Sequence, residues 1–237
     1  MTDTSTRTAY WRGVRDGAPF VLVVAPFALL FGVVATEAGL SVWETLAFSI
    51  LVIAGAAQFT ALQLMQENAP TVIVLISALA VNLRMAMYSA SLTPHLGATP
   101  LWHRALAAYM MVDQSYACSI LAYERNTHWT PAQKMAFYFG AITFVVPVWY
   151  AMTVTGALIG SAMPAGLALD FAVPITFIAM IAPALRTMAH VAAAVASVTL
   201  ALAFAFVPFN LGLIIAGIGG MVVGAQVELW MTRKTAA

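Results

Sequence analysis

The stretch APFVLVVAPFALLFGVVAT, residues 18–36, carries no charged side chain. A helix needs about 20 mostly apolar residues to cross a membrane, so this stretch is long enough. Further apolar segments follow along the chain, at 42–65, 71–92, 101–123, 135–159, 171–185, 189–207 and 211–231. These runs do not alternate apolar and polar residues as barrel strands do. The sequence therefore predicts an all-α bundle of about eight transmembrane helices, with seven as the alternative.

The composition supports a membrane protein and excludes several other classes. Of the 237 residues, 62% are hydrophobic and only 8% are charged, and the mean hydropathy is +0.92. A soluble domain carries about 25% charged residues, so an ordinary soluble enzyme, a nucleic-acid binder and a disordered regulator are excluded. We expect one transmembrane domain over residues 1–237, with a cytoplasmic segment at 1–17 and a cytoplasmic tail at 232–237.

Few residues are available for a metal, a disulfide or a cofactor. The net charge of +1 implies no nucleic-acid partner, and the single Cys118 excludes a disulfide framework. The four histidines are scattered singly and make no metal site. We expect no cofactor and no metal, and a partnership with the lipid bilayer.

The distribution of Lys and Arg predicts the orientation. If the N-terminus is cytoplasmic, the outer loops carry only Arg104, and Arg84 lies within a predicted span. The inner segments then hold the other basic residues, which are Arg7, Arg12, Arg15, Arg125, Lys134, Arg186, Arg233 and Lys234. Cytoplasmic loops are enriched in Lys and Arg, so both termini are expected inside.

Two charged residues lie deep inside predicted spans. Arg84 is about eight residues from the outer end of its segment, roughly 12 Å deep, and Asp113 lies roughly 14–18 Å deep in the next segment. With the two segments as antiparallel neighbours, both charges are expected at similar depth. The pair is either a structural ion pair or a substrate or proton site, and these alternatives do not exclude each other. Tyr88 and Ser91 share the helix face of Arg84.

Two further polar positions are candidates for hydrogen bonds to a ligand. Gln58 follows the small residues Ala54-Gly55-Ala56-Ala57, which permit close helix packing. Asn82 lies just before Arg84 on another face of its helix. The binding interpretation of Gln58 stands beside an ordinary packing role.

The last apolar segment carries small residues at four-residue spacing, namely Gly212, Ala216, Gly220 and Gly224. This ridge is suited to helix contact, either within the chain or with a partner subunit. The simplest signatures of zinc proteolysis, P-loop hydrolysis and elbow-serine hydrolysis are absent from the sequence. We therefore expect the protein not to be an enzyme.

Together these residues resemble the AzlC-type branched-chain amino acid permeases, over almost the whole chain. The pieces that carry the resemblance are Ala54-Gly55-Ala56-Ala57-Gln58-Phe59, Asn82-Leu83-Arg84 with Tyr88 and Ser91-Leu92, Asp113, and Leu169-Asp170-Phe171 leading to Pro174. Met85 and Gln114 stand where the family usually has a histidine and an acid. The resemblance implies an inner-membrane exporter of valine-like amino acids that works with a small AzlD-type membrane subunit.

The sequence thus predicts a secondary transporter that is driven by an ion gradient and exports branched-chain or related amino acids. Its candidate substrate-binding residues are Arg84, Asp113, Gln58, Asn82 and Tyr88. Arg84 is expected to bind the substrate carboxylate, and Asp113 to be its partner or the amine and proton site. The alternative is a membrane scaffold subunit whose partner carries the substrate path.

Overall fold

The structure, a computed structural model, describes residues 5–162, 185, 187–208 and 211–235, and their regular structure is helical. The helices are α1 (Thr6–Gly17), the 3₁₀ turn η1 (Ala18–Phe20), α2 (Val21–Glu37), α3 (Val42–Leu51), α4 (Gly55–Gln66), α5 (Thr71–Leu96), α6 (Leu101–Tyr109), α7 (Asp113–Arg125), α8 (Pro131–Ile142), α9 (Val145–Ala162), α11 (Met188–Ala203) and α12 (Gly212–Thr235). The chain divides into two compact units, Met1–Leu62 with Val81–Leu167, and Gln63–Ala80 with Ala168–Ala237. Each unit is described separately below.

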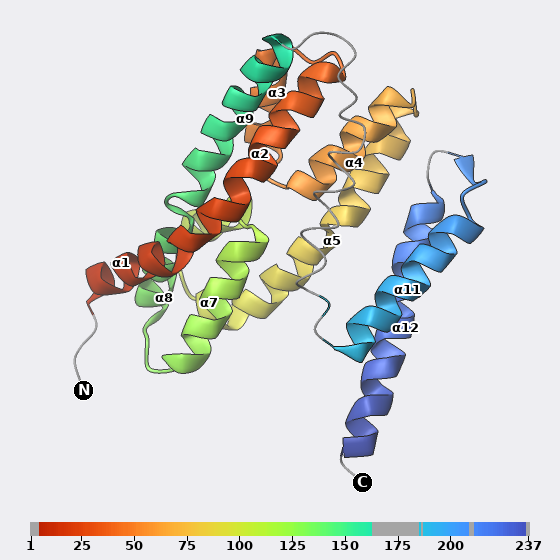
Figure 1. Ribbon diagram of the computed structural model, residues 1–237. Helices are drawn as coiled ribbons and strands as arrows, with labels where there is room; N and C mark the ends of the chain where they lie inside the picture. The colour runs from red at the N-terminus through yellow and green to blue at the C-terminus, as the bar shows by residue number, and fades with distance from the viewer. Residues whose placement is uncertain (1–4, 163–184, 186, 209–210, 236–237) are drawn as a thin grey trace. The chain divides into compact units, whose positions relative to one another are not determined.

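The first unit is built around the parallel pair α2 and α9, which lie side by side (Figure 1). Their backbones meet at glycines. A Cβ on Gly32 would overlap the carbonyl oxygen of Thr153, and a Cβ on Gly156 would overlap that of Leu29. Because the contact is backbone against backbone, the pair packs closely without needing water or charge.

Helices α3 and α4 form a hairpin. Gln58 Nε2 donates to Ser49 Oγ at 3.1 Å across nine positions. In a continuous helix those positions would be separated by roughly 13 Å along the axis. The ring of Phe31 contacts both Phe48 and Phe59, at centroid distances of 5.8 and 5.6 Å, so α4 returns alongside α3. Ser41 and Glu44 start the hairpin with a capping box.

Helices α6 and α7 form a second hairpin. The Tyr138 hydroxyl donates to the carbonyl of Ala107 on α6 at 2.7 Å and accepts from Ser115 on α7 at 3.3 Å. Ala107 and Ser115 lie on opposite sides of the break between α6 and α7, so one tyrosine of α8 contacts both limbs of the hairpin.

The second hairpin corrects the prediction that 101–123 is a crossing. Arg104 Nη1 donates to Gly97 O at 3.3 Å near the end of α5, and Met111 at the hairpin tip accepts from Ser89 further back along α5. Helix α7 then runs parallel to α5, and Tyr123 lies beside His95 at a ring distance of 5.2 Å. The predicted antiparallel arrangement was therefore wrong. At about 1.5 Å per residue, neither limb spans the roughly 30 Å hydrocarbon layer.

Both ends of this hairpin lie at the same end of the unit, which we call the basic face. Lys134 lies in the first turn of α8, and its Nζ is 3.1 Å from Nδ1 of His95 at the end of α5. Arg12 of α1 donates to Asn126 at 3.2 Å in the connection between α7 and α8. Arg104 therefore lies on the same face as Arg12 and Lys134, and not on the opposite one as predicted. The turn between α2 and α3, at the other end, is flanked by Glu37 and Glu44.

The second unit contains the packed pair α11 and α12. A Cβ on Gly220 would overlap Ser197, Gly224 faces Ala193, and Gly212 faces the carbonyl of Phe204. These glycines of the predicted ridge are therefore used within the chain, against α11 and its C-cap.

Among the described residues, four apolar helical stretches are long enough to cross a membrane: 6–37, 71–96, 131–162 and 212–233. Helix α11 is apolar but shorter. The predicted span at 42–65 is a hairpin and not a crossing, as is the span at 101–123. The predicted span at 171–185 lies outside the described residues except for Leu185. The predicted 1–17 segment contains α1, which packs against α8.

Candidate functional site

Arg84 and Asp113 lie together, as predicted. Arg84 Nε, on α5, is 3.1 Å from Asp113 Oδ1 in the first turn of α7. The contact is an ion pair without the alignment of a hydrogen bond, and both facing atoms are shielded from solvent. The rest of each side chain is open, with 31% of Arg84 and 45% of Asp113 exposed. Groups of both charges thus stay available to a ligand beside their mutual contact.

An aromatic stack flanks the ion pair. The rings of Tyr88 and Tyr116 are parallel within 10°, with centroids 4.1 Å apart. The Tyr88 side chain interacts with Asp113 and Arg84, and the Tyr116 hydroxyl is 3.1 Å from Ser91 Oγ. The predicted stripe of Arg84, Tyr88 and Ser91 is thereby confirmed as one face, and it is directed at α7. Tyr116 completes this site from the other helix.

A cavity of about 170 Å³ lies on the neighbouring strip of α5, between this helix, the α6–α7 hairpin and α8. Apolar groups make up most of its wall. Ser89 and Met111 line one end of it, whereas Arg84, Tyr88 and Asp113 are not among its lining residues. Its other end is formed by Gly97 and Arg104, at the basic face. The lining residues are Ser89, Leu92, Thr93, Leu96, Gly97, Arg104, Ala107, Ala108, Met111, Met135 and Tyr138.

The structure does not bring Gln58 to the ion pair. Gln58 is fully buried at the α3–α4 hairpin, where it donates to Ser49, and Ser49 Oγ is 3.3 Å from Thr153 Oγ1 of α9. Asn82 precedes Arg84 on α5, and its Oδ1 is buried without a hydrogen-bond partner among the described residues. Of the predicted binding residues, Arg84, Asp113 and Tyr88 lie together, whereas Gln58 lies apart from them at the α3–α4 hairpin.

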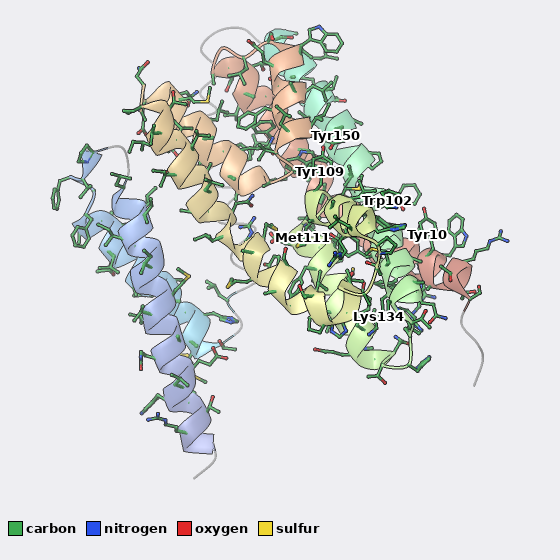
Figure 2. All side chains as sticks on the ribbon, turned by 180° about the vertical axis from the view of Figure 1, so that it is seen from behind. Tyr10, Trp102, Tyr109, Met111, Lys134 and Tyr150 are labelled. Carbon is green, nitrogen blue, oxygen red and sulfur yellow. The ribbon has the colours of Figure 1, made fainter. Side chains whose placement is uncertain are left out.

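The tips of the two hairpins are linked by a tyrosine that sequence reasoning did not assign a role. The Tyr109 hydroxyl, at the end of α6, donates to the carbonyl of Ile50 in the last turn of α3. The same hydroxyl is 3.1 Å from the hydroxyl of Tyr150 on α9 (Figure 2). No signal in the sequence marks this position, because the break that follows Tyr109 is itself apolar.

These features define a class of protein. Long apolar helices and two helical hairpins with apolar surfaces make a polytopic helical membrane protein, with a charged pair and a cavity inside one unit. Broken helices in membrane proteins are tolerated where they line a cavity or are covered by protein.

Comparison with known proteins gives the family. The family model described as "AzlC protein" matches residues 19–163, which is more than half of the chain, and the chain belongs to this family. It is 28% identical over 225 residues to an uncharacterized membrane protein of Archaeoglobus fulgidus, covering 93% of this chain and 96% of the relative. It is 27% identical over 184 residues to the inner membrane protein YgaZ of Escherichia coli, covering 73% of this chain and 71% of YgaZ. No solved structure matches the chain.

Proposed function

We propose that the protein is a secondary transporter of the bacterial inner membrane that exports valine-like branched-chain amino acids and uses an ion gradient. The observations that carry the proposal are the Arg84–Asp113 pair and an apolar cavity of about 170 Å³ on a neighbouring strip of α5. A free amino acid has a carboxylate, an ammonium group and a side chain. Arg84 binds the carboxylate, Asp113 binds the ammonium group, and the cavity holds the side chain.

The size and chemistry of the cavity favour a small aliphatic side chain. An apolar cavity of about 150 Å³ accepts a molecule of the size of benzene. A cavity of about 170 Å³ with Leu92, Leu96 and Met111 in its wall therefore accommodates an isopropyl or isobutyl group. A positively charged side chain would lose its hydration there without gaining a partner of opposite sign, because none of the described carboxylates lines the cavity.

The position of the cavity favours loading from the cytoplasm. It reaches the basic face, where Arg104, Arg12 and Lys134 gather, and cytoplasmic faces of membrane proteins are rich in Lys and Arg. With this face inside, the N-terminal helix α1 is also cytoplasmic. The described site is then open toward the compartment that supplies the substrate of an exporter.

The test is efflux of labelled valine from cells or proteoliposomes. Arg84→Ala should reduce efflux on the order of 30-fold or more, because removing one partner of a shielded charge pair costs about 2 kcal/mol or more. Arg125→Ala, which removes an exposed arginine at the other end of α7, is the matched control and should transport normally. Normal efflux by folded, membrane-inserted Arg84→Ala would reject the site.

We also propose that the transporter works with a small AzlD-type membrane subunit, and that its activity is transport and not catalysis. The family membership supports the partnership. Efflux should require co-reconstitution of this chain with the small subunit. Full efflux by this chain alone would remove the need for the partner, and efflux by the small subunit alone would favour the scaffold alternative.

A further inference from the structure

The α3–α4 hairpin and the facing part of α9 carry buried polar side chains that the proposed substrate site does not use. Thr45, Ser49, Gln58 and Thr153 are each 0% exposed. We call them the hydroxyl–amide cluster. They come from three helices, α3, α4 and α9, and none of the four is ionisable.

The hydrogen bonds within this cluster leave acceptors without donors. Gln58 Nε2 donates to Ser49 Oγ, and Ser49 Oγ is paired with Thr153 Oγ1. Among the residues that the structure describes, Gln58 Oε1 and Thr45 Oγ1 have no hydrogen-bond partner. Turning the amide over would satisfy the oxygen and leave its N–H groups unpaired instead. Since buried polar groups in folded proteins are almost always satisfied, the cluster lacks a ligand.

The chemistry of the unpaired atoms selects a positive ligand. A carbonyl oxygen such as Gln58 Oε1 accepts hydrogen bonds or binds cations, and it repels anions. The cluster holds no carboxylate, which a divalent cation would require to offset the loss of its water. The neutral oxygens therefore favour a monovalent cation.

One pair of oxygens, the hydrogen-bonded hydroxyls of Ser49 and Thr153, has the spacing that two ligands of one sodium ion would have. Calcium, which has nearly the radius of sodium, lies ~2.3–2.6 Å from its oxygen ligands. In a six-oxygen shell of that size, neighbouring oxygens are about 3.4 Å apart. Ser49 Oγ and Thr153 Oγ1 are 3.3 Å apart. Unwound backbone at helix breaks is a recurrent source of further carbonyl ligands for sodium in membrane transporters.

We propose that the hydroxyl–amide cluster of the α3–α4 hairpin binds a sodium ion, held by the side-chain oxygens of Ser49, Gln58 and Thr153, with Thr45 one turn before Ser49 on α3. Bound sodium fixes the tip of the α3–α4 hairpin. Tyr109 hydrogen-bonds the carbonyl of Ile50 on that tip, and Tyr109 belongs to the hairpin that carries Asp113. The role of this ion as the coupling ion of export rests on the proposed function, whereas its binding does not.

The binding test uses the full-length purified protein in detergent, with no amino acid present. Thermal unfolding is followed in NaCl, KCl and choline chloride at equal ionic strength, together with saturable binding of ²²Na⁺. We expect NaCl to raise the Tm above its value in the other two salts. Equal Tm values in all three salts and no saturable ²²Na⁺ binding would overturn the proposal and leave a buried water in the cluster.

Variants localise the ion. Gln58→Leu should abolish the sodium-dependent shift in Tm, and Ser49→Ala, a milder change, should raise the sodium concentration needed for it at least tenfold. The matched controls are Gln63→Leu, on the exposed side of α4, and Thr155→Ala, on the exposed side of α9, and both should retain the shift. Retention of the shift in folded Ser49→Ala and Gln58→Leu would place the ion elsewhere.

Valine efflux separates this inference from the proposed function. A Tm that depends on sodium, in a protein that exports no valine, would reject valine as the substrate and support the sodium site. Valine efflux that proceeds equally with and without sodium, from a protein whose Tm ignores sodium, would keep the transporter and reject the ion site.

Discussion

The two hairpins of the first unit have the same architecture and opposite chemistry. The α3–α4 hairpin packs fully buried neutral groups such as Gln58 and Ser49 against α9. The α6–α7 hairpin places a charged, half-open side chain, Asp113, against Arg84 of α5. A charge is costly to bury unless it is paired, whereas a neutral amide can be buried with hydrogen bonds alone. This difference is the reason for proposing a small ion at the first hairpin and a zwitterion at the second.

The strongest expected effect concerns the hairpin nature of α6–α7 itself. In a Cys118→Ser background, Ala98→Cys and His128→Cys should be labelled by a membrane-impermeant thiol reagent from the same side of the membrane. Glu37→Cys should be labelled from the other side. The effect is all-or-none, because the two connections that flank the hairpin lie on one face. Labelling of positions 98 and 128 from opposite sides would show that residues 101–123 cross the membrane.

The next prediction separates the two sites by charge. Asp113→Asn should reduce valine efflux on the order of 30-fold, because the amide no longer attracts the substrate ammonium or pairs with Arg84. It should leave the sodium-dependent Tm shift intact. Asp16→Asn, which removes a carboxylate beside exposed Arg15, is the control and should leave efflux unchanged. Loss of the sodium-dependent Tm shift in Asp113→Asn would show that the proposed sodium site and the proposed substrate site are not independent.

A smaller effect is expected from a change in the contact between α2 and α9. Gly32→Val should destabilise the protein by about 1–3 kcal/mol or prevent folding, because its Cβ would overlap the carbonyl of Thr153. Gly217→Ala is the control, since a Cβ there meets nothing within 4 Å, and it should be neutral or slightly stabilising. Unfolding by denaturant in detergent measures both. Equal stability of Gly32→Val and wild type would show that α2 and α9 can separate.

The smallest expected effect is on the link between the hairpin tips. Tyr109→Phe should lower valine efflux roughly fivefold, through the loss of about 1 kcal/mol of hydrogen bonding to Ile50. Tyr150→Phe should have a weaker effect, because the bond from Tyr109 to Ile50 remains. Initial efflux rates at equal protein levels provide the comparison. A larger loss in Tyr150→Phe would assign the link to the tyrosine pair instead.

The sequence predicted the helical membrane class and the meeting of Arg84 with Asp113, but not the hairpins. An apolar run of about 20 residues has the same hydropathy whether it crosses the membrane or turns back halfway. The breaks at residues 52–54 and 110–112 are themselves apolar and contain neither proline nor glycine. Nothing in their composition marks a turn.

The proximity of the charged pair was predictable for a different reason. Charges deep in apolar segments need partners, and few candidates exist in so apolar a chain. Gln58 was predicted among the substrate-binding residues, but the structure does not bring it to the ion pair, because an uncharged amide can be satisfied by any nearby hydroxyl. Ser49 and Thr153 were two of many hydroxyls in the sequence. Their approach to Gln58 depends on the α3–α4 turn, which the sequence did not reveal.

The placement of Arg104 has a consequence for how the chain is inserted into the membrane. In a continuous crossing of 101–123, this guanidinium would have to be translocated to the outside against the membrane potential, at about 2.3 kcal/mol per 100 mV. If the basic face is cytoplasmic, as proposed, both limbs of α6–α7 enter from that side, and the arginine stays in the compartment of the ribosome throughout synthesis. Insertion of this segment then requires only that a short tip, with Asp113 directly after it, enter the membrane.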